Sequence, residues 1–196
     1  LEGYLFPETY SFPSNRIKFD LTAREVLSTM VNQFKKEYGK VITDKHNLSI
    51  HEIVTLASIV QGECVYDDEM SLVSSVYTNR LNKNWLLQAD PTIQYLNPGK
   101  NRRLYNKDYK RFNNPYNTYI YKGLPPGPIN SPGIEAIKAA AYPEETSYMF
   151  FVAKGDNRHH FSVTEDEHNK AKHKYLKNLW DDIELNDCSS RTCSRI

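Results

Sequence analysis

The chain has 196 residues, of which 39% are hydrophobic, so it can bury a substantial core as one domain or two small lobes. Its 25 lysines and arginines nearly balance its 24 aspartates and glutamates, which argues against a general nucleic-acid or anionic-membrane binder. No segment reaches the roughly 18 to 20 consecutive apolar residues of a membrane span, and the three cysteines match no zinc-site spacing. These features predict a globular protein without a bound metal.

The first elements are an extended segment and a helix. Residues 1–12 are aromatic and β-prone, with Pro7 limiting any ladder, which predicts an edge strand or an extended segment. The spacing of Thr22 and Glu25 is that of a capping box, and an apolar stripe follows it. We expect this helix to end near Gly39, since glycine is a common C-terminal cap.

Three further helices are expected in the middle of the chain. A second capping box opens an apolar helix over 49–60, and apolar residues at helical spacing predict another over 67–81 that ends at Asn82. Asp90 is expected to cap a short helix that reaches Tyr95, with Pro91 at its first position.

The second half combines a rigid loop, a hairpin and helices. The proline- and glycine-rich loop 123–133 precedes a helix over 134–142, which Ser131-Pro132 is expected to cap. Strands over 148–153 and 160–163 form a predicted hairpin, a third capping box opens a polar helix from Thr164 to Trp180, and 186–196 is expected to be a flexible tail. The predicted fold class is α+β, a helical lobe with a small, mostly antiparallel sheet.

Two features of composition point to the ligand. Tyrosine is common, at 14 residues, and its flat rings suit sugars or bases. In 97–121, lysines and arginines alternate with aromatic residues, a pattern that suits single-stranded nucleic acid, although a loop beside a polysaccharide groove is the favoured interpretation in a chain of balanced charge.

Nine motifs in order resemble one known family. They are LEGYLFPETY, ASIVQGE, NRL, LQADPTIQY, NPYNTY, GLPPGPINSPG, AIKAAAYP, YMFFVA and the HHF segment with His168. Together they are similar to the catalytic domain of the endolytic murein transglycosylases, the YceG-like family. The resemblance implies a catalytic domain over 1–185 that cuts nascent peptidoglycan between MurNAc and GlcNAc, leaves 1,6-anhydro-MurNAc ends and thereby terminates glycan polymerisation.

The resemblance also implies a setting for the protein. Members of the family are bacterial and are anchored in the cell membrane by one N-terminal helix, with the catalytic domain on the outer face. This sequence starts at Leu1 in strand-like residues and is expected to be a fragment that lacks the anchor. Glycan strands are the expected partner, cell-wall synthases are a further candidate, and no cofactor or nucleic acid is expected. Cys188 and Cys193 are close enough in the tail to pair in an oxidising compartment, or to be free thiols.

The main departure from the family pattern is Gln61, which stands where the resemblance places the catalytic glutamate. Protonation of a glycosidic oxygen needs a carboxylic acid, which an amide cannot replace. The chain is therefore expected to be an inactive glutamate-to-glutamine variant, with a naturally inactive peptidoglycan-binding module as the alternative. Glu63 lies roughly 200° further around the helix, so we expect a supporting role for it unless Gly62 breaks the helix.

The remaining motif residues are expected to bind substrate or shape the cleft: Glu2, Gln88, Asp90, Thr92, Asn117, Tyr119, Pro125, Pro126, Asn130 and His160. Several have structural alternatives. Asp90 is as well explained as a helix cap, Asn117 and Tyr119 as loop packing, Glu2 as part of a salt bridge, and His160 as a structural histidine. His168 is expected to pack a helix against the sheet.

Overall fold

The computed structural model describes residues 1–12, 22–43, 46–97, 104 and 106–175. The predicted tail 186–196, with Cys188 and Cys193, and the expected helix end at Trp180 lie outside these residues. Within them, helices predominate and one two-stranded antiparallel sheet is present, so the α+β prediction is confirmed. None of the helices in the described ranges combines the length and the hydropathy that crossing a bilayer requires.

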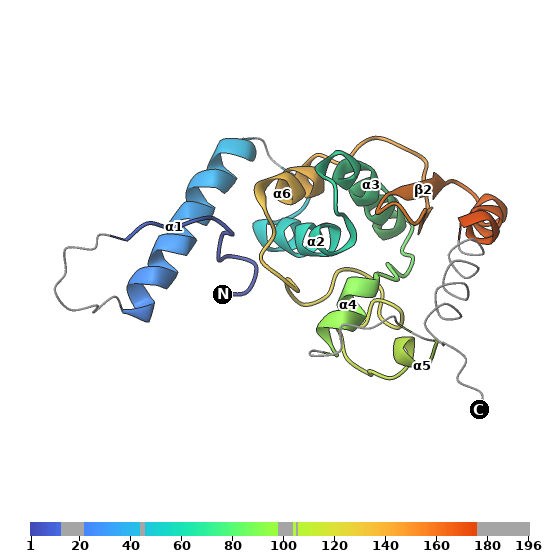
Figure 1. Cartoon of the computed structure of the whole chain (residues 1–196), viewed down its shortest axis with the longest axis horizontal. Helices are drawn as coiled ribbons and strands as arrows, with labels where there is room; N and C mark the ends of the chain where they lie inside the picture. The colour runs from blue at the N-terminus through green and yellow to red at the C-terminus, as the bar shows by residue number, and fades with distance from the viewer. Residues whose placement is uncertain (13–21, 44–45, 98–103, 105, 176–196) are drawn as a thin grey trace, which may run out of the picture.

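Helix α2 (Ile50–Glu63) is the centre of the core. Every residue from Ile53 to Val60 is buried, because this helix is apolar on all sides. Helices α3 (Met70–Asn82) and α6 (Ile134–Ala141) pack against it and against each other (Figure 1). Ser49 and Glu52 form the predicted capping box, and the helix runs three residues beyond the predicted end at Val60.

Other elements surround this three-helix core. Helix α1 (Ala23–Val41) contacts α6 at one side, and α4 (Asp90–Tyr95) lies below α2 with the single turn α5 (Asn106–Tyr109) near it in Figure 1. The Thr22 capping box is confirmed and α1 ends at Val41, near Gly39 as predicted, but the C-cap is Ile42, so the capping role predicted for Gly39 is wrong. Nothing lies within 4 Å of a side-chain atom at Gly39, and its φ is not positive.

Residues 1–12 form no strand, so of the two alternatives predicted for them the extended segment remains; it begins with a turn in which Gly3 (φ +86°) leaves room for Pro128. Two other predictions need correction. The N-cap of α6 is Gly133, without a side-chain cap, and not Ser131-Pro132. The turn 67–69 is a 3₁₀ helix that leads into α3, so the third predicted helix has two parts.

The hairpin of β1 (Phe150–Ala153) and β2 (His159–Ser162) pairs Phe150 with Ser162, as an antiparallel ladder. The helical residues 165–175 follow it and begin with the predicted capping box of Thr164 and Glu167.

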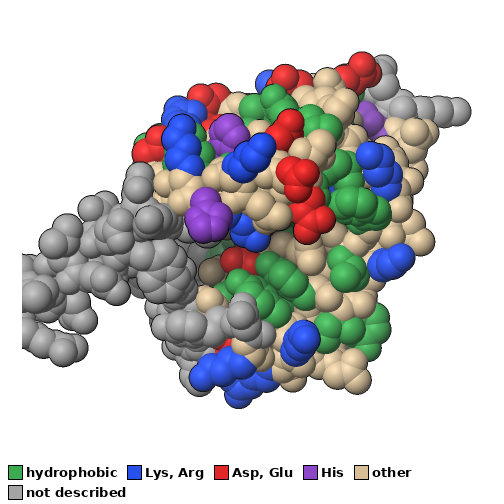
Figure 2. Space-filling model, turned by 90° about the vertical axis from the view of Figure 1, so that its right-hand side faces the viewer, with side chains coloured by type: hydrophobic (Ala, Val, Ile, Leu, Met, Phe, Trp, Pro, Cys, Tyr) green, Lys and Arg blue, Asp and Glu red, His purple; other side chains and the backbone are tan. Residues whose placement is uncertain are grey.

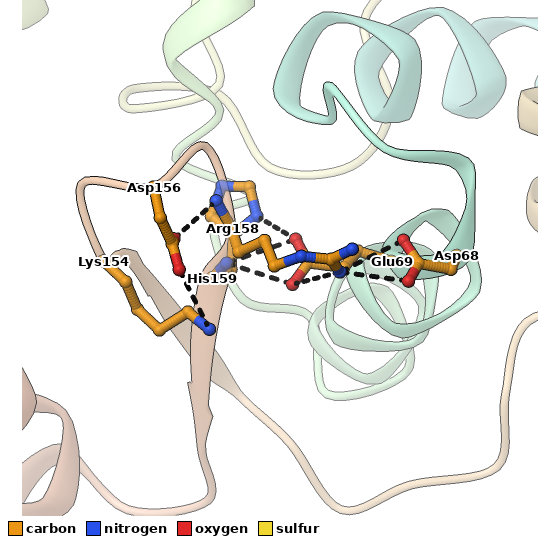
Figure 3. A network of polar contacts seen from close by, with 6 residues as sticks. All are labelled: Asp68, Glu69, Lys154, Asp156, Arg158 and His159. Carbon is orange, nitrogen blue, oxygen red and sulfur yellow. Dashed lines mark hydrogen bonds and ion pairs between the residues drawn. The ribbon is translucent and has the colours of Figure 1, made fainter.

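An ion network holds the turn end of the hairpin against the turn before α3 (Figure 3). Glu69 accepts from the backbone N–H of His159 at 3.2 Å and lies 3.0 Å from its ring Nδ1. Arg158 bonds to Asp68 at 3.0 Å and also lies 3.8 Å from Glu69. The buried carboxylate of Glu69 is therefore surrounded by donors and lies near the guanidinium of Arg158.

Candidate active site

The last turn of α2 presents two polar side chains on opposite sides. Helical geometry separates residues 61 and 63 by roughly 200°, and the helix continues through Gly62 without a break. Gln61 accepts a hydrogen bond from the backbone N–H of Gly133 at 3.0 Å, at the start of α6. Glu63 instead points to α3, where the Tyr77 hydroxyl donates to it at 2.6 Å. The two positions therefore have different environments.

A close approach of two helices brings a second carboxyl group to Glu63. A side-chain atom at Gly62 would lie 2.7 Å from Cβ of Pro91, so only glycine lets α2 contact the start of α4 this closely. Asp90 precedes that proline and interacts electrostatically with Glu63. The sequence motifs around 61–63 and 90–92 thus meet in space.

Glu63 is a carboxyl group whose environment favours its protonated form. Burial is the main cause that raises its pKa to about 7; the Tyr77 hydrogen bond opposes this, and the negative charge of Asp90 adds to it. The positive charge of Arg80 has a smaller lowering effect. A pKa near neutrality suits a group that first donates and later accepts a proton.

Asp90 is held by two tyrosines. The hydroxyl of Tyr119 donates to its Oδ1, and Tyr109 is a second hydrogen-bonding partner. Burial raises the pKa of Asp90, and the two tyrosines partly offset that rise. Asp90 is the first residue of α4, while the N-cap is Ala89 without a side-chain bond, so the prediction that Asp90 caps the helix is wrong.

Arg80 adds a buried cation that bonds neutral groups. Its Nε donates to the Met149 carbonyl at 2.8 Å and its Nη1 to the Leu87 carbonyl at 2.7 Å. Burial lowers its pKa, and the nearby charge of Glu63 acts in the opposite direction. Arg80 therefore fixes the chain on two sides of the cluster while it contributes positive potential to it.

A pocket of about 580 Å³ opens beside these groups. Its lining consists of Gln88, Lys107, Tyr109, Lys110 and Tyr119. The two tyrosine rings stack with centroids 4.3 Å apart, and both bond Asp90 behind them. Figure 2 shows a hollow on one face of the molecule with acidic atoms at its floor and hydrophobic side chains beside them. Asp90 therefore lies next to the pocket through its bonds to the two tyrosines, and Glu63 is the neighbour of Asp90.

Three of the predicted substrate-binding residues belong to this cluster: Gln88, Asp90 and Tyr119. Gln88 is exposed in a left-handed conformation (φ 53°), and its backbone N–H bonds the Thr118 carbonyl at 3.1 Å. A non-glycine residue in this conformation is uncommon and is held here by the neighbouring loop.

Thr92 and Asn117 are fully buried, and their polar atoms are used inside the fold. The Thr92 hydroxyl donates to the Ala89 carbonyl at 2.7 Å. The Asn117 amide donates to the carbonyls of Tyr109 and Phe112, each at 2.9 Å. For Asn117 the loop-packing alternative describes the structure, and neither residue faces the pocket.

The rigid loop 123–133 packs along α2. Pro125 is buried, whereas Pro126 is exposed and its carbonyl lies 2.8 Å from Nε2 of His51. Asn130 donates to the Ser58 carbonyl at 2.7 Å, while its Oδ1 is buried without a partner in the described part of the chain. This loop fixes the side of α2 that carries Gln61.

The other predicted contacts lie elsewhere. Glu2 accepts from the Tyr95 hydroxyl at 2.8 Å, which is the main cause that raises the pKa of Tyr95 to about 12. His160 is exposed on β2 with its ring 5.5 Å from Tyr175. His168 stacks on Phe150 at 5.0 Å, and burial lowers its pKa to about 4, as expected for a packing residue.

Sequence reasoning missed Tyr77 and Tyr109 as members of the site, and it included Arg80 only as part of the NRL motif. Tyr77 lies within the apolar stripe of its helix and carries no signal that its hydroxyl meets a carboxylate. Arg80 lies in the NRL motif and Tyr109 in the basic aromatic stretch, so a signal existed for both without an assigned role. Among the residues described, no group of acids, histidines and cysteines is placed to hold a metal ion.

Comparisons with known proteins agree on one family. The model of the YceG-like family matches residues 1–174. A protein of Bacillus subtilis named endolytic murein transglycosylase is 38% identical over 178 residues, which are 90% of this chain and 48% of that protein. Another of that name from Streptococcus pneumoniae is 32% identical over 87% of this chain and 31% of its own length.

A solved structure supports the same grouping. The crystal structure of a YceG-like protein from Listeria monocytogenes is similar, with a TM-score of 0.72 and 36% identity. The alignment covers 86% of this chain and 54% of the Listeria chain. The sequence therefore spans about half, or less, of the length of the relatives that it matches.

Proposed function

The chain belongs to the YceG-like family, and from this premise we propose that it cleaves the glycosidic bonds of peptidoglycan strands as a lytic transglycosylase. The names of the relatives supply the reaction class. The observation that carries the proposal in this chain is Glu63, a half-buried carboxyl group with a pKa of about 7 beside a tyrosine-walled pocket.

The proposed reaction needs only one acid-base group. Protonated Glu63 donates its proton to the glycosidic oxygen between MurNAc and GlcNAc as the C1–O bond breaks. The carboxylate then takes the proton of the 6-hydroxyl of the same MurNAc while O6 bonds to C1. The product is a 1,6-anhydro end, no water is consumed, and Glu63 is protonated again.

Asp90 and the tyrosines prepare Glu63 for both steps. The negative charge of Asp90 helps to keep Glu63 protonated near neutral pH, and Tyr77 orients its carboxyl group. Tyr119 and Tyr109 bind Asp90, and their rings, stacked on each other, line the pocket in which we place a sugar.

The assignment of Gln61 stays a prediction, and the geometry favours Glu63 over it. The amide oxygen of Gln61 is taken by the N–H of Gly133, on the side of α2 that faces α6. Tyr77, Asp90 and Arg80, which tune a proton-transfer group, all act on Glu63. On this basis the chain is proposed to be active, and the inactive glycan-binding module is the competing proposal.

The wider role follows from the substrate. Peptidoglycan lies outside the cytoplasm, so we place the domain on the outer face of the bacterial cell membrane, anchored by a segment beyond this sequence. Cutting of nascent strands would end their polymerisation, and cell-wall synthases are the proposed partners.

Two substitutions test the acid. The chain, Glu63→Gln and Gln61→Glu are incubated with purified glycan strands, and 1,6-anhydro ends are quantified by mass spectrometry. We expect activity in the chain, a loss of at least about 10²-fold in Glu63→Gln, and little change in Gln61→Glu. An inactive chain that Gln61→Glu activates would overturn the role of Glu63. If neither the chain nor Gln61→Glu releases 1,6-anhydro ends, the lytic assignment is overturned.

The end groups also separate a second reaction class. Asp90 gives the site two carboxyl groups, the number that a glycoside hydrolase uses. Reducing ends without the anhydro ring would establish hydrolysis.

A further inference from the structure

Two lysines lie at the pocket beside the carboxyl pair. Lys107 is in the turn α5 and Lys110 follows that turn, on either side of Tyr109. Both side chains are exposed, and both line the pocket of about 580 Å³. Neither forms an ion pair with another residue in the described ranges. Their charges are therefore available to a ligand.

The rest of the pocket lining is neutral. Gln88 and the stacked rings of Tyr109 and Tyr119 complete it; both tyrosine hydroxyls bond Asp90, which interacts with Glu63. The mouth thus combines flat apolar faces with two positive charges. A wholly neutral glycan would use the faces alone, whereas a glycan that carries carboxylates would also pair with the lysines.

The chemistry of peptidoglycan provides such carboxylates at every second sugar. A muramyl residue carries a lactyl group, whose carboxylate is free on a bare strand. On a substituted strand this group is joined to a peptide with its own free carboxylates. Chitin, which has the same backbone linkage and acetamido groups, has none.

We propose that Lys107 and Lys110 select anionic, muramyl-containing glycans over neutral ones by pairing with these carboxylates. The proposal rests on the proposed function, because it concerns the substrate of the same pocket. The two lysines lie outside the motifs around residues 61–63 and 88–92. They are in and after the turn α5 and line the same pocket as Gln88.

Binding is the measurement that tests this selection. The probes are a peptide-bearing muramyl tetrasaccharide, the same compound with its carboxyl groups amidated, and chitotetraose. Titration calorimetry uses Glu63→Gln, so that the probe is not consumed. We expect the carboxylated probe to bind more tightly than the amidated one, with a difference that shrinks as salt increases.

Neutralising both lysines should remove that difference. Adding Lys107→Gln and Lys110→Gln should weaken binding of the carboxylated probe roughly 3- to 10-fold and leave the amidated probe unchanged. Lys35→Gln with Lys36→Gln is the matched control, since it removes the same charge from α1, which Figure 1 shows at the opposite end of the molecule from α5.

The outcomes separate the two proposals. Equal binding of the three probes, or an equal effect of the control pair, would overturn the role of the lysines and leave the proposed function standing. Failure to bind any of the three glycans, with the fold intact by circular dichroism, would overturn the proposed function itself.

Discussion

Glu63 is a half-buried acid at the end of α2 and Glu69 a buried acid in the turn before α3, and their surroundings differ. Glu69 bonds the backbone N–H and the ring of His159 and lies near the guanidinium of Arg158 (Figure 3). Glu63 is bonded by the neutral hydroxyl of Tyr77 and by the backbone N–H of Asp90, and it lies near the carboxyl group of Asp90, with Arg80 as a weaker positive influence.

This difference shows how burial alone does not define a site. At Glu69 the cost of burying a charge is offset by the donors of His159 and the guanidinium of Arg158. These contacts connect the hairpin to the core. At Glu63 it is not fully offset, so the group favours its protonated form and can exchange a proton near pH 7. Replacing each acid by its amide tests the contrast.

At Glu63 the amide should stabilise the fold at high pH. The folded-state pKa is raised from 4.5 to about 7, so the folded protein binds the proton more tightly than the unfolded chain does. The contribution of protonated Glu63 to the free energy of unfolding is then fully present below pH 4.5 and is lost as the pH rises through about 7. Glu63→Gln is expected to gain about 3 kcal/mol at pH 8 and almost nothing at pH 4. Urea denaturation at the two pH values measures this, and a loss of stability at pH 8 contradicts it.

Replacing Glu69 by its amide should change the free energy of unfolding in the opposite direction and destabilise the fold. Glu69→Gln removes the carboxylate that His159 bonds through its backbone N–H and its ring and that lies 3.8 Å from Arg158, and we expect a loss of about 2 kcal/mol in the free energy of unfolding at pH 7. Asp68→Asn is the control, because the Asp68 side chain is 65% exposed and its ion pair should contribute little. Equal effects of the two substitutions would refute the contrast between them.

Substitution of Gly62 should have the next largest effect on the free energy of unfolding. Gly62→Ala forces Pro91 away from α2, and we expect a cost of about 1–2 kcal/mol together with reduced cleavage, since Asp90 moves with the proline. Gly39→Ala is the matched change in α1, where nothing lies within 4 Å, and it should stabilise by up to about 1 kcal/mol. Thermal unfolding of both variants measures the pair, and a neutral Gly62→Ala would mean that α2 and α4 separate easily.

The smallest effect concerns Asp90. Asp90→Asn removes a negative charge that raises the pKa of Glu63, so the pKa should fall toward 4.5. Because the acid form is then lost at lower pH, the alkaline limb of the pH–activity profile should move to lower pH. A profile that keeps its position while its height falls would show that Asp90 acts by position alone.

Local signals predicted the helices better than their ends. The capping boxes at Thr22 and Ser49 depend on residues three apart, and the structure contains both. Gly39 and Asp90 were expected to act as caps, but the helix continues through the first and begins at the second. Each choice depends on what packs nearby, and the sequence does not contain that information directly.

The candidate site was predicted only in part, because long-range packing also determines which residues meet there. The motifs around Gln61 and Asp90 indicated a common cleft, and the structure brings both to the last turn of α2. Which of the two helix-end residues meets the second acid depends on the rotation of α2 relative to α3 and α4. That rotation is set by long-range packing, such as the contact of Gly62 with Pro91, and not by the helix itself.

Arg80 connects the edge of the pocket to the start of the hairpin through hydrogen bonds. One guanidinium bonds the carbonyl of Leu87, just before Gln88 at the pocket, and the carbonyl of Met149, just before β1. The hairpin in turn is tied to the turn before α3 through Glu69. Movement of either segment away from Arg80 removes one of the two bonds that position its guanidinium, so we expect the pocket edge and the hairpin to affect each other's stability through this one side chain.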